Sequence, residues 1–124
     1  MSEKIQKRLM KCVEYKHEIL IVTADEQKNI FCQFIVEDHG DKIEGQWEFT
    51  ANEYLNNFEL SPIQIQKLEE EEGFTLDVNY SKQYSCEKGN LEECFQKIAE
   101  KSVKILREIY NIQSFDSLQF ESFN

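Results

Sequence analysis

The residues of this chain that could do chemistry are two histidines, four cysteines and many carboxylates. His17 and His39 are expected at the start of a strand and in a hairpin turn, as surface residues and not as general bases or metal ligands. The chain has no Gly-rich phosphate loop, no nucleophile elbow and no His-Glu-x-x-His zinc motif. Asp38 and Asp41, on either side of Gly40, could bind a cation weakly but lack the ligand ladder of a calcium-binding loop. We therefore predict that the protein is not an enzyme and holds no metal or cofactor.

The four cysteines form neither a Cys-x-x-Cys pair nor the spacing of a zinc site. Cys12, Cys32 and Cys94 fall on apolar stripes, where cysteine behaves as a small hydrophobic residue. Cys86 lies close to Gly89 in a polar turn, so we expect its side chain to be exposed. All four are predicted to be free thiols.

The length and composition of the chain favour one acidic domain. At 124 residues the chain can bury a single core without metals or disulfides. It has 14 Lys and Arg against 24 Asp and Glu, a net charge of −10. This charge opposes binding to nucleic acid or to an anionic membrane, and it suits either a basic protein partner or simple solubility. The N-terminal segment has charges among its apolar residues, and no stretch reaches the length of a signal peptide or a membrane span, so we expect a cytoplasmic location.

Periodicity predicts a sheet with helices before and after it. Apolar residues at helical spacing predict an amphipathic helix from Ser2 to about Tyr15. The short apolar run from Ile19 to Val22 predicts a strand that is central in the sheet or buried on both faces. Alternation predicts the remaining strands. The predicted strands are 18–23, 29–37, 43–49 and 74–80, the last reaching Tyr84 at most.

Two capping boxes predict two short helices in the middle of the chain. Thr50 could cap a helix over 51–58, with Glu53 reaching back to the Thr50 amide. Ser61 could cap the next helix in the same way with Gln64 as its partner. Eleven residues separate the two caps, so the segment must turn between them.

Glycine and asparagine mark the remaining helix ends. Gly73 is expected to end the second short helix, because glycine readily adopts the left-handed C-cap conformation. Asn90, with Glu93 three residues later, is expected to open the longest helix, which runs to about Tyr110. The apolar stripe of this helix predicts core packing, with a dimer seam as the alternative.

The expected order of elements is α-β-β-β-α-α-β-α. This order predicts an α+β fold with an antiparallel sheet of about four strands and helices packed mainly on one face. Residues 1–112 are expected to form a single domain and 113–124 a C-terminal tail. The tail carries four large apolar residues, which is unusual for a disordered segment, so it is expected to pack onto the body or to contact a second chain.

Three surfaces are candidates for contact with a protein partner. Phe31 and Ile35, on the second face of their strand, could form apolar pockets beside an extended peptide, unless the sheet is covered on both sides. The polar face of the next strand and the acidic turn before Gly73 offer carboxylates to a basic partner, although a solvated last turn is the simpler explanation of that turn. The candidate residues are Phe31, Ile35, Glu44, Gln46, Glu48, Glu69, Glu70, Glu71 and Glu72.

A series of motifs extends over about residues 1–112. It consists of an aromatic-Gln-Phe strand, a strand leading into a short helix that ends in Leu, a Leu-Ser-x-x-Gln helix start, a Gly-aromatic helix end and a long closing helix. The matching positions are Phe31, Gln33, Phe34, Asn52, Tyr54, Leu55, Leu60, Ser61, Gln64, Leu68, Gly73, Phe74, Ile98, Leu106 and Tyr110. The series resembles the YbjN and TY-Chap group, relatives of type III secretion chaperones. The resemblance implies a non-enzymatic, protein-binding module with a chaperone-like α+β fold that is often a dimer, and it carries over no catalytic residue.

Two functions follow as hypotheses. The first is a chaperone-like adaptor that binds a client polypeptide and keeps it soluble or competent for secretion. The alternative is an acidic immunity protein that neutralises a cognate toxin by direct binding. A hydrolase is a third possibility, because numerous carboxylates leave an acid/base pair open. The first two predict a protein partner, no nucleic acid and no membrane.

Overall fold

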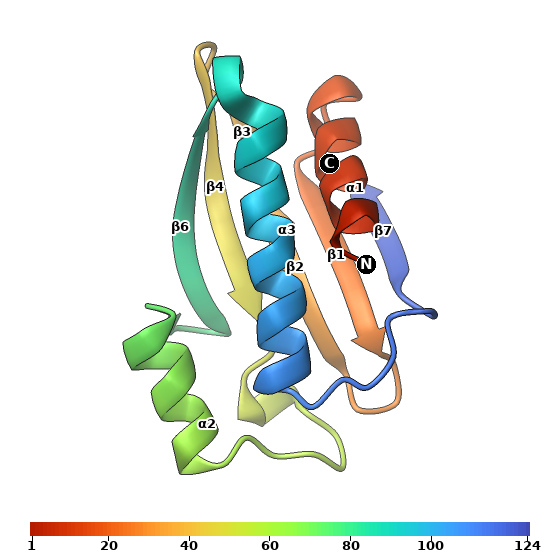
Figure 1. Ribbon diagram of the computed structural model, residues 1–124, viewed down its shortest axis with the longest axis vertical. Helices are drawn as coiled ribbons and strands as arrows, with labels where there is room; N and C mark the ends of the chain where they lie inside the picture. The colour runs from red at the N-terminus through yellow and green to blue at the C-terminus, as the bar shows by residue number, and fades with distance from the viewer.

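Seven strands, all paired antiparallel, form one sheet in the computed structural model, which describes residues 1–124 (Figure 1). The strands lie in the order β5-β6-β4-β2-β1-β7, and the short β3 pairs with β4 beside this path. The strands are β1 (Ile19–Asp25), β2 (Ile30–Ile35), β3 (Glu37–Asp38), β4 (Lys42–Phe49), β5 (Thr75–Leu76), β6 (Tyr80–Glu87) and β7 (Gln119–Phe123).

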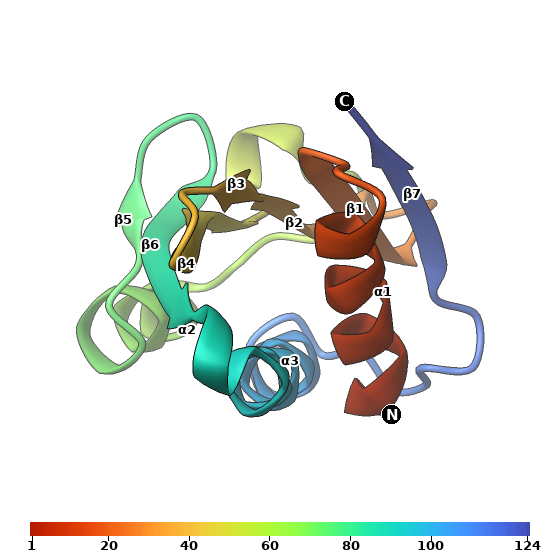
Figure 2. The ribbon, with the colours of Figure 1, turned by 90° about the horizontal axis from the view of Figure 1, so that it is seen from above.

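The helices lie on one side of this sheet (Figure 2). Helices α1 (Ser2–Glu14) and α3 (Leu91–Glu108) pack side by side against it, and α2 (Pro62–Gln66) lies beside β6. A π-helical turn, η2 (Lys67–Glu71), continues α2 directly. No helix is both long enough and apolar enough to cross a membrane.

The core fills the space between the sheet and the two long helices. Every second residue of β1, β2 and β4 is buried, as alternation in a half-covered sheet requires. Trp47 and Tyr110 also bury polar atoms, but Trp47 Nε1 donates to Ser102 Oγ at 3.1 Å and Tyr110 OH donates to Thr50 O at 2.7 Å. No buried side-chain polar atom is left without a hydrogen bond, so the interior carries no uncompensated polar cost.

The predicted α+β class with an antiparallel sheet is confirmed, but the prediction of about four strands is wrong. The predicted strand 74–80 folds back at Asp77, whose N–H donates to Asn79 O at 2.9 Å, and so divides between β5 and β6. β6 then continues to Glu87 through residues expected to form a loop. β1 was expected to be central or buried on both faces, but it lies between β2 and the edge strand β7 and is buried on one face only.

The C-terminal segment set apart as a tail contains the edge strand β7. Its five residues pair with β1, and Phe120 lies beneath the Arg8 guanidinium at 5.1 Å from the ring centre. Phe115, earlier in the segment, is buried. Packing onto the body, one of the two expectations, is therefore what the structure shows.

Only one of the two predicted capping boxes forms. Ser61 Oγ accepts from Gln64 N, and the Gln64 side chain accepts from Ser61 N, as predicted. Thr50 Oγ1 instead accepts from Phe31 N at 2.9 Å and donates to Phe31 O at 3.1 Å. With its hydroxyl engaged across the sheet, Thr50 caps nothing, and the predicted helix shrinks to the 3₁₀ turn η1 (Asn52–Tyr54). Gly73 has a positive φ of 78° and ends the helical segment as predicted.

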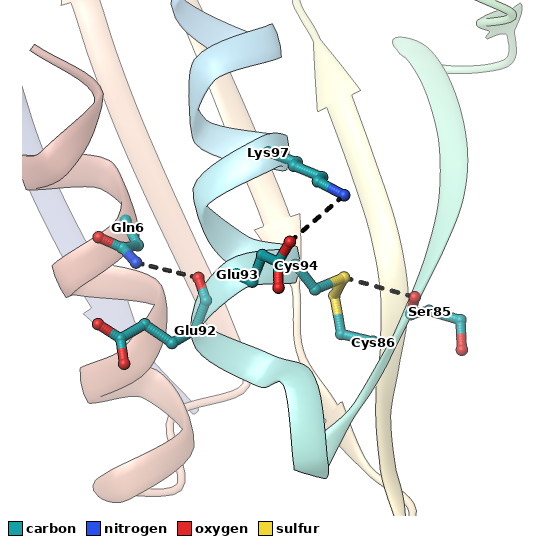
Figure 3. The surroundings of a disulfide bond; sticks show 7 residues. All are labelled: Gln6, Ser85, Cys86, Glu92, Glu93, Cys94 and Lys97. Carbon is teal, nitrogen blue, oxygen red and sulfur yellow. Dashed lines mark hydrogen bonds and ion pairs between the residues drawn. A yellow bond between two sulfur atoms is a disulfide. The ribbon is translucent and has the colours of Figure 1, made fainter.

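A disulfide joins the end of β6 to the first turn of α3 (Figure 3). Its partners are Cys86 and Cys94, so the prediction of four free thiols is wrong for this pair. Cys86 is also buried, not exposed, because β6 continues through the expected turn and points its side chain at the core. The 3₁₀ turn η3 (Lys88–Asn90) leads into α3, and Asn90 makes no side-chain cap bond there. Cys12 and Cys32 are free and buried, as expected of small apolar residues.

Candidate functional site

The side of the sheet opposite α1 and α3 is not covered by a long helix (Figure 2). We call it the open face. It is formed by the strand residues whose side chains alternate with those of the core. The open face comprises Ile19, Ile21, Thr23, Phe31, Gln33, Ile35, Lys42, Glu44, Gln46, Glu48, Ser81, Gln83, Ser85, Glu87, Gln119, Glu121 and Phe123.

One half of the open face is apolar. Ile19 lies opposite Ile35 on one side and opposite Phe123 on the other, so three apolar side chains form a row across β2, β1 and β7. Ile21 and Phe31 add two apolar side chains to this half, where Ile21 lies between Gln33 and Glu121 and Phe31 lies opposite Thr23. Ile19, Ile21, Phe31 and Ile35 are half-buried, and Phe123 is 42% exposed. The chain itself leaves this apolar surface in contact with water, which is typical of an interface.

The other half is polar and acidic. Gln33 Nε2 donates to Glu48 Oε1 at 3.0 Å, and Ser81 Oγ donates to Gln46 Oε1 at 2.6 Å. These bonds fix amide and carboxylate groups in a layer beside the apolar row. The predicted site residues Phe31, Ile35, Glu44, Gln46 and Glu48 thus lie together on one face, as the alternation of their strands predicted.

The charge of the molecule is unevenly distributed. Helices α1 and α3 hold eight of the 14 Lys and Arg but only six of the 24 Asp and Glu. The rest of the chain therefore has six cations against 18 carboxylates. The open face has one basic side chain, Lys42, which pairs with Glu44 at 3.2 Å. It has four carboxylates, those of Glu44, Glu48, Glu87 and Glu121. The open face therefore presents a negative field beside its apolar row.

The predicted acidic turn, Glu69 to Glu72, lies on the helix side and is separate from the open face. Glu72 forms an ion pair with Lys101 of α3 at 3.1 Å, and its side chain is only 13% exposed. Its carbonyl also accepts from Lys82 Nζ at 2.9 Å. Glu70 accepts from Gln66 Nε2 at 3.0 Å. Two lysines thus compensate the negative end of this helix, and the turn packs α2 and η2 against α3.

Shifted pKa values belong to groups with a structural role. Burial raises the pKa of Cys32 to about 12, and it also raises the pKa of Tyr84 and Tyr110 above the ordinary tyrosine range. The hydrogen bond from Lys88 holds the pKa of Asp38 below its usual value. In a catalytic centre, groups with shifted pKa values are expected to converge in one cleft. These four groups do not converge in this way.

A cavity of about 600 Å³ lies where α1 ends, and we call it the α1 cavity. Its floor is apolar and its rim is polar. The floor residues are Cys12, Val13, Ile35, Val36 and Ile43, and the rim residues are Lys16, His17, Glu18, Glu37, Asp38 and His39. The sequence did not predict this cavity, because the two histidines come from separate loops that only the fold brings together. No group of His, Cys, Asp or Glu here or elsewhere is arranged to hold a metal ion.

Comparisons with protein-family models, with curated proteins and with solved structures give no match to this chain. The resemblance to the YbjN and TY-Chap group therefore rests on the sequence motifs alone.

Proposed function

We propose that this protein is a non-enzymatic, chaperone-like adaptor whose open face binds a polypeptide segment rich in basic and apolar residues. The observation that carries the proposal is the row of Ile35, Ile19 and Phe123 on an uncovered sheet face beside a layer of carboxylates. Apolar area bordered by polar and charged groups is usual in a protein-binding surface.

The charge of the surface selects the partner. An acidic or strongly anionic molecule would be repelled by Glu44, Glu48, Glu87 and Glu121, whereas a basic segment would be attracted. The same repulsion opposes pairing of two open faces in a homodimer, because each copy carries a net charge of −10. A homodimer, if it forms, is expected to use another surface.

The immunity protein is the second candidate, and the uneven charge distribution favours it. Outside α1 and α3 the chain has 18 carboxylates and only six cations, and this negative charge would steer a basic toxin toward this side of the molecule. The two candidates differ in the form of the partner: an adaptor binds an extended or unfolded segment, and an immunity protein binds a folded toxin at its active site.

Capture from the native host, followed by mass spectrometry, tests the proposal when three baits are compared. The baits are the wild type, the double variant Glu44→Lys/Glu48→Lys on the open face, and the control Glu69→Lys/Glu70→Lys on the helix side. Both variants change the net charge equally, at exposed or half-exposed positions. We expect the partner to be retained by the wild type and by the control, and to be lost at least tenfold with the open-face variant. Retention by the open-face variant together with loss by the control would move the binding surface to the acidic turn and overturn the proposal.

The cytoplasmic location is part of the proposal, and the disulfide offers a direct test of it. Disulfides are rare where glutathione keeps thiols reduced. Alkylation of thiols inside living cells before lysis, followed by mass spectrometry of the peptides containing Cys86 and Cys94, would show whether the pair is reduced. Reduced thiols are expected in the cytoplasm, and a fully formed bond would place the protein in an oxidising compartment.

A further inference from the structure

The α1 cavity exists because β2 leaves the main sheet at Ile35. The chain continues into β3, which pairs with β4 only, so no strand fills the space beside the end of α1. Val36 N donates to Glu18 O at 2.8 Å on one side of this departure point. Tyr84 OH donates to Ile35 O at 2.8 Å on the other. The walls of the cavity are therefore held by hydrogen bonds to the backbone and do not depend on a ligand.

Gly45 allows β2 and β4 to approach closely at the point where β2 ends. A Cβ atom at Gly45 would lie 1.7 Å from Ile35 O, a backbone atom that cannot move aside. The absence of a side chain there lets the Ile35 carbonyl lie directly against β4 at the point where β2 ends.

The rim carries more negative than positive charge. Asp38 is neutralised by Lys88, whose Nζ lies 2.8 Å from its carboxylate. Glu18 makes no ion pair, and Glu37 has no lysine or arginine partner, its nearest basic group being the His39 imidazole at 3.9 Å. Against these two carboxylates the rim offers the single amine of Lys16. The C-terminal end of α1, the negative end of its dipole, also meets the cavity at Cys12 and Val13.

We propose that the α1 cavity receives an arginine side chain of the bound polypeptide. An arginine has an apolar stem that can pack on the partly exposed Val13 and Ile35 of the floor, and a cationic head that can meet Glu18 and Glu37 at the rim. Ile35 belongs both to this floor and to the open face, so a segment bound on the open face can place one side chain in the cavity. This inference rests on the proposed function for its partner, but the cavity can be tested without that partner.

The test is an NMR titration of the isotopically labelled full chain with the capped peptide acetyl-Gly-Arg-Gly-amide. The control peptide carries citrulline in place of arginine, because citrulline has nearly the same shape and no charge. We expect saturable shifts of the Val13, Ile35, Val36 and Ile43 methyl signals with arginine, and at least fivefold weaker binding with citrulline. Equal binding of the two peptides, shifts confined to other regions, or no saturable response would overturn the inference.

Two neutral substitutions test the rim. Glu18→Gln and Glu37→Gln should each weaken arginine binding several-fold, and Glu59→Gln, an exposed carboxylate outside both the cavity and the open face, should leave it unchanged. Equal effects of all three would indicate general charge attraction and would overturn the assignment to this cavity. Because the peptide titration uses no native partner, arginine binding together with failure of the capture experiment would reject the proposed function alone.

Discussion

The two faces of the sheet contain similar side chains but have different surroundings. On β2, Cys32 and Phe34 point at the helices and are fully buried, whereas Phe31 and Ile35 point the other way and stay half-buried. One strand therefore supplies apolar residues to both faces, and only one face receives a covering layer from α1 and α3. A hydrophobic strand is thus evidence of a buried face only where another element has the length and the apolar stripe to cover it.

The largest expected effect compares one phenylalanine from each face. Phe49 packs against Phe74 and Tyr110 with ring centres 5.2 and 5.9 Å apart. Phe49→Ala should lower the free energy of unfolding by about 3–5 kcal/mol, because it leaves a cavity in the core. Phe31→Ala should cost roughly 1 kcal/mol, because its side chain already meets water. Chemical denaturation of both variants measures the difference, and equal losses would show that the open face is covered.

A smaller effect is expected from the disulfide that ties the covering helix α3 to β6. The two cysteines are separated by 8 positions in the sequence. For a loop of this length, the loss of chain entropy in the unfolded state stabilises the fold by about 2.5 kcal/mol. Reduction by dithiothreitol should lower the stability of the wild type by about this amount. The variant Cys86→Ala/Cys94→Ala is the control, since its stability should not respond to the reductant. A response in the variant would point to Cys12 or Cys32 instead.

The next prediction separates the two hydroxyl residues that were expected to act as equal caps. Thr50→Val should cost about 2 kcal/mol, because it leaves the N–H of Phe31 without its partner in a buried place. Ser61→Ala should cost about 1 kcal/mol, the usual value of an exposed cap. Thermal unfolding of the two variants gives this order, and a larger loss at Ser61 would contradict it.

The smallest effect concerns Asp38 at the edge of β3. Its hydrogen bond with Lys88 lowers its pKa in the folded state below the ordinary 3.8. A carboxyl group with a lowered folded pKa stabilises the protein above its unfolded pKa, and this contribution is lost as the pH falls through the folded value. Asp38→Asn should therefore be slightly less stable than the wild type at neutral pH, and the gap should close below about pH 3.8. The difference in stability should be small, because the Asp38 side chain is exposed. If the difference persists at pH 2, it comes instead from the hydrogen bond that Gly40 N donates to Asp38.

The parts of the fold that could be predicted depend on local chemistry. Alternation in β4 correctly assigned Trp47 and Phe49 to the core, and Glu44, Gln46 and Glu48 to the opposite face. The Ser61 box and the left-handed Gly73 were also correct, because a cap is completed by residues within one turn. The candidate site was predictable to the same extent: its residues on β2 and β4 share a face because side chains alternate.

The parts that failed depend on residues far away in the sequence. The Thr50 hydroxyl binds Phe31, 19 residues earlier, and this contact replaces the predicted cap. The turn at Asp77 and the extension of β6 to Glu87 follow from pairing with β4, which gives β6 a hydrogen-bonded partner along its whole length. The ion pair between Glu72 and Lys101 was also beyond prediction, because Lys101 lies on another helix.

By itself the sequence determined the period of each element, the side of each strand that is apolar and the excess of negative charge. These properties follow from backbone geometry and composition, which each segment carries without its neighbours. Only the tertiary structure decided which face of the sheet α1 and α3 cover, that Cys86 meets Cys94, and that β7 returns to pair with β1. Burial and pairing require two distant segments to meet, and a pattern within one segment does not specify its partner.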